Sequence, residues 1–344
     1  MMDLGGPKIR VKLKNKSSIL EIKKHKNYTL GYHNSDINID KKLNFTQVTR
    51  NAKIKIDDGC LSFNIIKIKA HQITIKALNT GIITDRKGVN FPGTHLNVPA
   101  VTPIDKKNIL DAIAMKVDWL AQSFVRSSSD IYPIQRILKS KEYYIPIIAK
   151  IEKPEAIHNL NAIINQYDGI LIARGDLGVE MPLSTLPKLQ KQIINRCIYN
   201  KKPCIVATQM LESMIHHDRP TRAEVNDVAN AIYDCVDAVM LSGETAVGKF
   251  PVEAVTMMSD IINSVEQDFV AENFNRMIEK QHIKTKENRE SICNAAMTIS
   301  NDLGIENIVI MTETGSTAQT MAQYRPNSKI FALCPHSEVC SQLA

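Results

Sequence analysis

The sequence predicts an α/β protein centred on a parallel (β/α) barrel, with a small β domain before the barrel and a further α/β segment after it. Two changes of pattern predict this division. Short alternating runs give way to alternating strands and helices near residue 100, and a separate βαβ unit begins near residue 285. The third observation is that every strand of the middle region ends in a polar or charged cluster. Because an open sheet concentrates function at one switch point, polar groups at many strand ends favour a barrel.

Composition excludes several classes of protein. A 44% share of hydrophobic residues with 23% charged residues is too apolar for a disordered chain. No uncharged apolar run approaches the ~18 residues of a membrane-spanning helix, and the first residues do not resemble a signal peptide. The seven cysteines are scattered and never spaced CxxC. This argues against a disulfide framework or a zinc site and for a reducing, cytoplasmic location. The formal charge of +7 is mild, so we expect neither nucleic acid nor a membrane as partner.

The first region, residues 10–97, is predicted to be a small antiparallel β domain. Apolar and polar residues alternate in it, and Asp-Gly and Asn separate the runs. The predicted strands lie in VKLKNK, SILEIKK, KIKIDDG, LSFNIIKI and ITIKAL.

The middle region, residues 98–275, is predicted to form the barrel. Apolar strands are expected at 117–124, 145–152, 168–173, 203–210 and 237–244. Amphipathic helices are expected near 105–115, 129–140, 153–166, 183–200, 222–233 and 251–270. Because the strands are apolar throughout, we expect both faces of the sheet to be covered. Residues 276–344 then supply one βαβ unit with the strands NIVIM and KIFALC.

Candidate catalytic side chains follow the ends of neighbouring barrel strands. Glu152 ends one strand and Asp176 follows the next, so both carboxylates can face one point. Two carboxylates with open positions suit Mg²⁺ or Mn²⁺ bound jointly with a substrate oxygen. Lys150 lies on the same side as Glu152, where its charge is costly unless it meets an anion such as a phosphate or an enolate. The alternative is that these three residues form a structural ion network at the barrel rim.

Longer motifs around these residues resemble the pyruvate kinase family, in its bacterial type with the GPKIR motif. The matching segments run through the chain in family order: DLGGPKIR (3–10), KIDDG (55–59), RKGVNFPG (86–93), AKIEKPEA (149–156), DGILIARGDLGVEMP (168–182), ATQMLESM (207–214) and RPTRAEVNDVANAIYDCVDAVMLSGETAVGKFP (219–251). The resemblance implies a (β/α)8 TIM-type barrel, an inserted β-barrel lid domain on the nucleotide side and a C-terminal α/β domain of the allosteric type. It also implies the last step of glycolysis, in which the phosphoryl group of phosphoenolpyruvate passes to ADP to give pyruvate and ATP.

The resemblance assigns catalytic roles to Lys150, Thr208, Ser242 and Glu244 and metal-binding roles to Glu152 and Asp176. Lys150 matches the lysine that stabilises the phosphoryl group in flight, and Glu152 and Asp176 match the carboxylates that hold the divalent metal. Ser242 and Glu244 match residues of the proton path toward the methylene carbon. Positioning and charge neutralisation, which these groups supply, account for most of phosphoryl-transfer catalysis.

Other matching residues would bind the substrate and the nucleotide. Thr208 and the backbone of Arg174, Gly175 and Asp176 match the pocket for the substrate carboxylate. In the lid, the positions near the ADP or ATP phosphates are Arg10, Asp57 and Lys87. Without the resemblance, Asp57 would be read as part of a hairpin turn and Lys87 as a solvated lysine.

Lys8 bears on the requirement for a monovalent cation. Potassium-dependent members of the family carry glutamate at this place, whereas potassium-independent members carry lysine, whose ammonium group can replace the charge of the ion. The resemblance therefore implies that K⁺ is not required, and it places Asp3 in the same cation region, near Lys8.

A loop in the C-terminal segment resembles part of the family's allosteric sugar-phosphate site. Its hydroxyl groups and backbone amides could hold a phosphate, or its Ser or Gly could simply cap the next helix. The candidate residues are Thr312, Thr314, Gly315, Ser316 and Thr317.

The resemblance leaves the chain short at both ends. Residues 1–9 match a stub of the third barrel strand, so two preceding βα units, with an arginine that grips the transferring phosphoryl group, have no counterpart. A fragment or misassigned start, a decaying gene and a functional shortened protein stay open as explanations. The chain is then either a pyruvate kinase, homotetrameric if full length, or an inactive remnant that keeps nucleotide or sugar-phosphate binding. A third alternative, an aldolase of phosphoenolpyruvate or pyruvate, is disfavoured by the lid.

Overall fold

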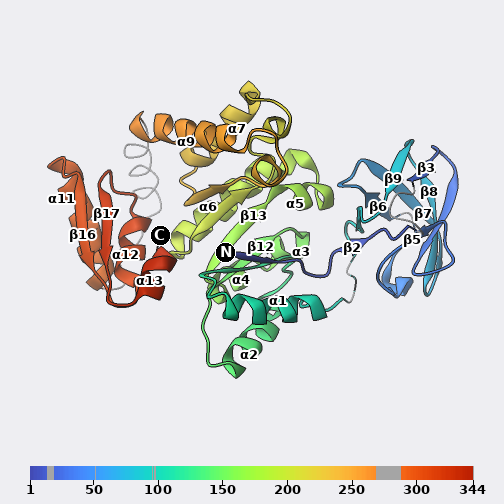
Figure 1. Cartoon of the computed structure of the whole chain (residues 1–344), viewed down its shortest axis with the longest axis horizontal. Helices are drawn as coiled ribbons and strands as arrows, with labels where there is room; N and C mark the ends of the chain where they lie inside the picture. The colour runs from blue at the N-terminus through green and yellow to red at the C-terminus, as the bar shows by residue number, and fades with distance from the viewer. Residues whose placement is uncertain (14–18, 51, 95, 97, 269–287, 344) are drawn as a thin grey trace.

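The centre of the molecule is a curved parallel sheet of six strands. A computed structural model describes residues 1–13, 19–50, 52–94, 96, 98–268 and 288–343. The sheet has the order β1-β11-β12-β13-β14-β15, and every pairing in it is parallel (Figure 1). Its strands span Met2–Leu4, Leu120–Gln122, Ile147–Ile151, Gly169–Ala173, Cys204–Ala207 and Ala238–Met240. This parallel β/α arrangement confirms the predicted fold class, and within the described residues β1 and β15 are the two edges of the sheet.

Helices between the strands cover the sheet. They are α1 (Pro103–Ala114), α2 (Tyr132–Ser140), α3 (Pro154–His158), α4 (Leu160–Gln166), α5 (Arg174–Glu180), α6 (Leu186–Tyr199), α7 (Arg222–Tyr233), α8 (Gly243–Ala246) and α9 (Pro251–Asp268). Short 3₁₀ turns occupy η2 (Ser128–Ile131), η3 (Leu183–Thr185) and η4 (Glu212–Ile215). Thr102 and Thr221 each begin a helix through a capping box, which satisfies backbone N–H groups that a helix start would otherwise leave unpaired.

Two predicted elements differ in extent from the sequence pattern: a helix is interrupted and a strand ends early. The helix expected over 153–166 is broken at Asn159, which caps α3 and whose side chain donates to the Arg126 carbonyl at 2.8 Å. The strand expected over 203–210 ends at Ala207, because Thr208 and Gln209 both have positive φ angles, of 77° and 57°. Local hydrogen bonding and backbone turns therefore override the apolar pattern here.

The β domain lies at one end of the molecule (Figure 1). Its main sheet has the order β2-β10-β6-β7-β8-β4-β5, and β3 pairs with β9. The elements are β2 (Ile9–Arg10), β3 (Ile19–Ile22), β4 (Asn27–Gly31), β5 (Ile37–Asn38), η1 (Phe45–Gln47), β6 (Lys53–Ile56), β7 (Leu61–Lys69), β8 (Gln72–Ala77), β9 (Gly81–Thr84) and β10 (Gly88–Asn90). The strands that enter and leave this domain, β2 and β10, pair antiparallel. Residues 14–16 of the predicted VKLKNK strand lie outside the described residues.

A βαβ unit forms the other end of the molecule. It contains α11 (Asn288–Asp302), β16 (Asn307–Met311), α12 (Ser316–Gln323), β17 (Lys329–Leu333) and α13 (Ser337–Leu343), and its two strands are parallel. The predicted boundary at 275/276 lies outside the described residues. In the ranges that the structure describes, no helix is long and apolar enough to cross a membrane.

Candidate active site

Two acidic side chains meet at the carboxyl ends of adjacent strands. β12 and β13 pair in parallel register, so the residues that follow them reach the same edge of the sheet. Glu152 comes directly after β12 and is 1% exposed, while Asp176 stands in the first turn of α5. The pKa of Glu152 is raised to about 7, chiefly by burial. The ammonium of Lys150 acts to lower this pKa, whereas the negative charge of Asp176 acts to raise it. The predicted pair of carboxylates is therefore brought together.

Lys150 joins these carboxylates to the first strand. Its ammonium lies 3.2 Å from Oε1 of Glu152 and 3.0 Å from Oδ2 of Asp3, and it donates to Oγ of Ser123 at 2.9 Å. Burial would lower the pKa of Lys150, but the two carboxylates outweigh that effect and raise it. Lys150 is thus a charged, largely enclosed cation, and Asp3, expected in the cation region near Lys8, is its partner.

The backbone of Phe124 fixes the orientation of Glu152. Phe124 has a φ of 58°, and in this conformation its N–H donates to Oε2 of Glu152 at 2.7 Å. A bulky residue in the left-handed region is rare and costs about 1–3 kcal/mol. The ring of Phe124 also lies near two ammonium groups, with Nζ of Lys8 at 5.7 Å and Nζ of Lys153 at 5.9 Å from its centroid. Sequence reasoning did not select Phe124, because nothing in the pattern marks a positive φ outside glycine.

Lys8 pairs with the second acidic residue. Its ammonium lies 2.9 Å from Oδ1 of Asp176, and the two side chains are 22% and 20% exposed. A positive charge is therefore built in beside the candidate metal site.

The turn after β14 packs against the start of α5. Arg174 donates to the Thr208 carbonyl from Nη2 at 2.8 Å and forms an ion pair with Asp227 at 2.7 Å. A Cβ on Gly175 would lie 2.6 Å from Cγ2 of Thr208, so only glycine allows this approach. The Arg174 guanidinium thus holds the turn at Thr208. No local pattern in the sequence indicates that Asp227, on α7, is its partner.

Glu244 is enclosed by backbone donors. It is 1% exposed, and its carboxylate accepts the N–H of Leu211 at 3.1 Å and the N–H of Ser242 at 2.8 Å. Glu244 therefore ties the segment after β14 to the end of β15. Ser242 itself is exposed at the start of α8.

A cleft of about 1070 Å³ opens between the β domain and the sheet edge. Asp176 and Thr208 line it from the barrel, and Asp58 and Gly59 line it from the β6–β7 turn. Lys55 fastens this turn to α5 by donating to the Val179 carbonyl at 2.6 Å. The predicted hairpin turn at 57–59 is present, with φ angles of 59°, 48° and 89°.

The three predicted nucleotide-side residues, Arg10, Asp57 and Lys87, lie in the same β domain but do not line this cleft. Lys87 pairs with Asp57 at 2.7 Å, and this hydrogen bond raises the pKa of Lys87 against a smaller effect of burial. Arg10 donates through Nη1 to the Arg86 carbonyl at 3.0 Å. Each of these three side chains thus has a partner within the β domain.

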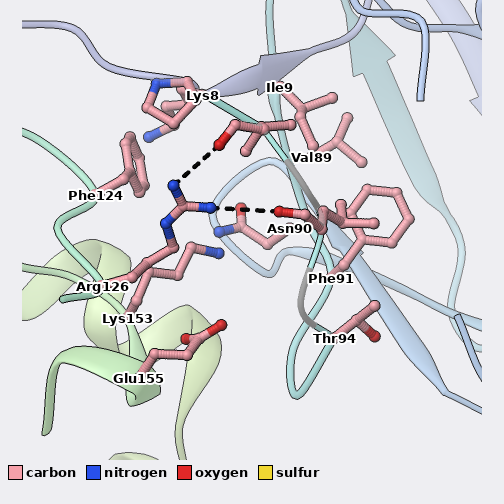
Figure 2. Close-up of a pocket in the computed structure, with 13 residues that line it drawn as sticks. Lys8, Ile9, Val89, Asn90, Phe91, Thr94, Phe124, Arg126, Lys153 and Glu155 are labelled. Atoms are coloured by element: carbon pink, nitrogen blue, oxygen red, sulfur yellow. Dashed lines mark hydrogen bonds between the residues drawn. The ribbon is translucent and has the colours of Figure 1, made fainter. Parts of the chain in front are cut away.

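A smaller pocket marks the hinge between the β domain and the barrel. Figure 2 shows Arg126 reaching across it, where its guanidinium donates to the carbonyls of Leu96 at 3.4 Å and Val98 at 2.9 Å. Lys8 and Lys153 both lie near the Phe124 ring in the same view.

Glu180, at the end of α5, connects the two parts at this hinge. Its Oε1 accepts from Nδ2 of Asn90 at 2.9 Å and from Nζ of Lys153 at 2.5 Å, and its side chain is 2% exposed. The β domain is thereby bonded to the helix that carries Asp176. The sequence does not predict this contact, because Asn90 and Glu180 are far apart in the chain.

The candidate phosphate loop is a turn between β16 and α12. Gly315, with a φ of 80°, is the N-cap of α12, as one of the sequence alternatives expected. Thr312 donates its N–H to the Leu333 carbonyl at 2.9 Å, and the hydroxyls of Thr314 and Ser316 lie 3.1 Å apart. Thr317 follows in the first turn of α12.

The carboxylates fit a divalent cation that takes further ligands from substrate and water. Across the described parts of the chain, no group of three or more His, Cys, Asp and Glu has the geometry of a metal site. Glu152 and Asp176 offer two carboxylates, and Mg²⁺ beside substrate phosphates is usually bound through one or two. A cation between them would also relieve the repulsion by which Asp176 raises the pKa of Glu152.

Comparisons with known proteins agree with this geometry. The sequence matches the family description "Pyruvate kinase, barrel domain" over residues 1–255 and "Pyruvate kinase, alpha/beta domain" over residues 290–344. It is 40% identical to pyruvate kinase 2 of Synechocystis, over 100% of this chain and 58% of that protein. It is 37% identical to pyruvate kinase of Clostridium acetobutylicum, over 100% of this chain and 73% of that protein. The crystal structure of a pyruvate kinase from Cryptosporidium parvum superposes with a TM-score of 0.92 at 35% identity, over 99% of this chain and 72% of that one. The chain thus spans between 58% and 73% of the length of these relatives.

Proposed function

Because the chain belongs to the pyruvate kinase family, we propose that it transfers the phosphoryl group of phosphoenolpyruvate to ADP and protonates the resulting enolate to pyruvate. The observation that carries this proposal is the cluster of Lys150, Glu152 and Asp176 at adjacent strand ends. A structural ion network could also explain these three charges, but it gives no reason for Asp176 to line a large cleft that residues of the β domain also line.

In this proposal, Glu152 and Asp176 hold Mg²⁺ or Mn²⁺, which supplies charge neutralisation at the phosphoryl and enolate oxygens. Lys150 stabilises the phosphoryl group while the bond between the phosphorus and the enol oxygen breaks and the bond between the phosphorus and ADP forms. Its two carboxylate partners keep Lys150 protonated, so it acts as a cation throughout. K⁺ is not required, because the Lys8 ammonium already provides a monovalent charge next to Asp176.

The remaining roles in this proposal belong to residues that bind the substrate, carry the proton or cover the nucleotide. The Thr208 turn and the backbone of Arg174–Asp176 hold the substrate carboxylate, and the Arg174–Asp227 pair keeps that turn in place. Ser242 lies on the proton path and is held there by Glu244. The β domain closes over the nucleotide with Arg10, Asp57 and Lys87, and excludes water from the enolate.

Three further assignments belong to the same proposal. The loop at 312–317 binds a sugar-phosphate or nucleotide effector, with hydroxyls and amides as donors. If full length, the protein is a homotetramer, and it works in the cytoplasm. The domains are 10–97, 98–275 and 276–344, with residues 1–9 as a barrel strand.

A lactate-dehydrogenase-coupled assay with phosphoenolpyruvate, ADP and Mg²⁺ tests the activity. We expect turnover for the natural chain and a loss of at least about 10²-fold for Lys150→Gln, since preorganised charge contributes on that scale. Lys106→Gln, an exposed lysine on α1, is the matched control and should keep its rate. Calorimetric ADP binding without turnover would instead support an inactive remnant that keeps nucleotide binding.

Metal binding is measured separately by titration with Mn²⁺ followed by electron paramagnetic resonance. Glu152→Gln should weaken binding by at least about tenfold. Asp3→Asn, at a carboxylate that is hydrogen-bonded to Lys150 and Ser123, should leave it within a factor of about three. Equal Mn²⁺ affinity of Glu152→Gln and the natural chain would refute the metal assignment.

A further inference from the structure

The C-terminal unit contains two cysteines whose sulfur atoms are almost in bonding contact. Cys334 directly follows β17, and Cys340 lies in α13. Their Sγ atoms are 2.6 Å apart, well inside the ~3.5–4.0 Å of ordinary non-bonded contact. A disulfide needs the sulfurs at about 2.0 Å, so bond formation requires a movement of only a fraction of an ångström.

The turn between β17 and α13 creates this approach. The carbonyl of His336 accepts the N–H groups of Val339 at 3.1 Å and Cys340 at 3.2 Å, which winds the chain back into α13. The Sγ of Cys340 thereby comes to 3.8 Å from the carbonyl oxygen of Cys334. The backbone of this turn thus brings the two cysteines next to each other.

Access to solvent sets this pair apart from the other cysteines. Cys340 is exposed and Cys334 is partly exposed, whereas Cys197, Cys204, Cys235 and Cys293 are buried. Cys197 and Cys204 also contact each other, but no reagent can reach them. The remaining cysteine in the described residues, Cys60, is exposed in the β domain.

We propose that Cys334 and Cys340 form a dithiol modification site that low-molecular-weight disulfides, such as oxidised glutathione, convert to an intramolecular disulfide. The Cys340 thiolate attacks one sulfur of the reagent, forming a mixed disulfide and releasing one reagent thiol. Cys334 then attacks the Cys340 sulfur, forming the protein disulfide and releasing the second reagent thiol. The two cysteines lose two electrons and two protons in total, and the reagent disulfide gains them.

The order of attack follows from the surroundings of the two thiols. Cys340 is the more exposed of the two. The hydrogen bond with Cys340 raises the pKa of Cys334, which disfavours its thiolate. Such an exposed, reversible disulfide is of the redox-responsive kind found in reducing compartments, not part of a structural framework.

The disulfide would act on the turn that precedes α12. A Cβ on Gly315 would lie 3.3 Å from Val339 and 3.2 Å from Leu343, so α13 packs directly over this turn. Tying Cys340 to the end of β17 fixes α13 in that place. We therefore expect oxidation to slow amide hydrogen exchange at 312–317 and 337–343.

Peptide mapping of the full chain tests the proposal. The reduced protein is treated with oxidised glutathione, alkylated and digested with trypsin, which places both cysteines in the peptide 330–344 and Cys60 in the peptide 56–67. We expect 330–344 to lose two hydrogens and take no alkyl group, while 56–67 is alkylated or carries glutathione. Alkyl groups or glutathione adducts on both cysteines of 330–344 would overturn the proposal.

Two variants separate the pair from general thiol reactivity. In Cys340→Ser, Cys334 should appear as an alkylated or glutathione-bearing residue, and the exchange difference between oxidised and reduced protein should vanish. Cys60→Ser should leave the disulfide yield unchanged. A yield that falls at least tenfold in Cys60→Ser would show that the oxidation is not confined to this pair and would count against the site.

Discussion

The Lys8 ammonium lies 2.9 Å from Oδ1 of Asp176, although 168 positions separate the two residues in the sequence. Lys8 stands just before the entry strand of the β domain and Asp176 in the helix that follows β13. A fixed positive charge therefore sits where the proposed reaction gathers negative charge, and it comes from the hinge of the domain that covers the cleft.

This relationship predicts the response to monovalent cations. The natural chain should have the same rate, within about twofold, in K⁺, Na⁺ and tetramethylammonium buffers. Lys8→Glu reverses the charge beside Asp176 and should lower the rate at least about tenfold, or ~1.4 kcal/mol in barrier, with partial recovery in K⁺. Initial rates in the three buffers check this. A strong K⁺ requirement in the natural chain would contradict the role given to Lys8.

Gly175 provides a test of the substrate-carboxylate turn. Its missing side chain admits Cγ2 of Thr208, and an added methyl would meet that atom at 2.6 Å. Gly175→Ala should therefore displace the turn and lower kcat/KM for phosphoenolpyruvate by about 10²-fold. Gly5→Ala is the control, since nothing lies within 4 Å of its added Cβ. If both variants keep the natural kcat/KM, the Thr208 turn does not position the substrate.

Glu180 provides a test of the bond between the β domain and the barrel. Glu180→Ala removes the partner of Lys153 and of Asn90 in a buried place, which should cost about 3–5 kcal/mol of stability. Urea unfolding measures that loss. The double variant Lys153→Met with Glu180→Leu removes both charges and should recover most of it. Equal losses in the single and double variants would show that the ion pair is not the source of the effect.

Glu224 predicts a component of acid sensitivity. Burial opposes ionisation of Glu224, but hydrogen bonds from Ser213 and Thr221 outweigh it and lower its pKa below the usual 4.5. A carboxyl group whose pKa is lower in the folded state stabilises the fold above pH ~4.5 and loses that contribution as the pH falls through the folded value. Unfolding midpoints should therefore fall more steeply below pH ~4.5 in the natural chain than in Glu224→Gln. Glu253→Gln, an exposed glutamate on α9, should follow the natural curve; if Glu224→Gln follows it too, the capping box does not contribute.

Much of the fold could be predicted from the sequence because the signals are local. The alternation of the β domain, the apolar barrel strands and the capping residues Thr102 and Thr221 act within a few positions of the elements that they define. The ends of elements were less predictable. The strand through Ala207 ends where Thr208 adopts a positive φ, and the residue types at that point do not predict this conformation.

The sequence by itself determined which charged residues stand at the strand ends, because the positions of the strands and the identities of Lys150, Glu152 and Asp176 are local properties of the chain. Only the tertiary structure decided their partners. Asp3 reaches Lys150, Asp227 reaches Arg174, and Asn90 reaches Glu180. An ion pair or hydrogen bond depends on a few ångströms between atoms, and that spacing is set by how strands and domains pack, which no local pattern records.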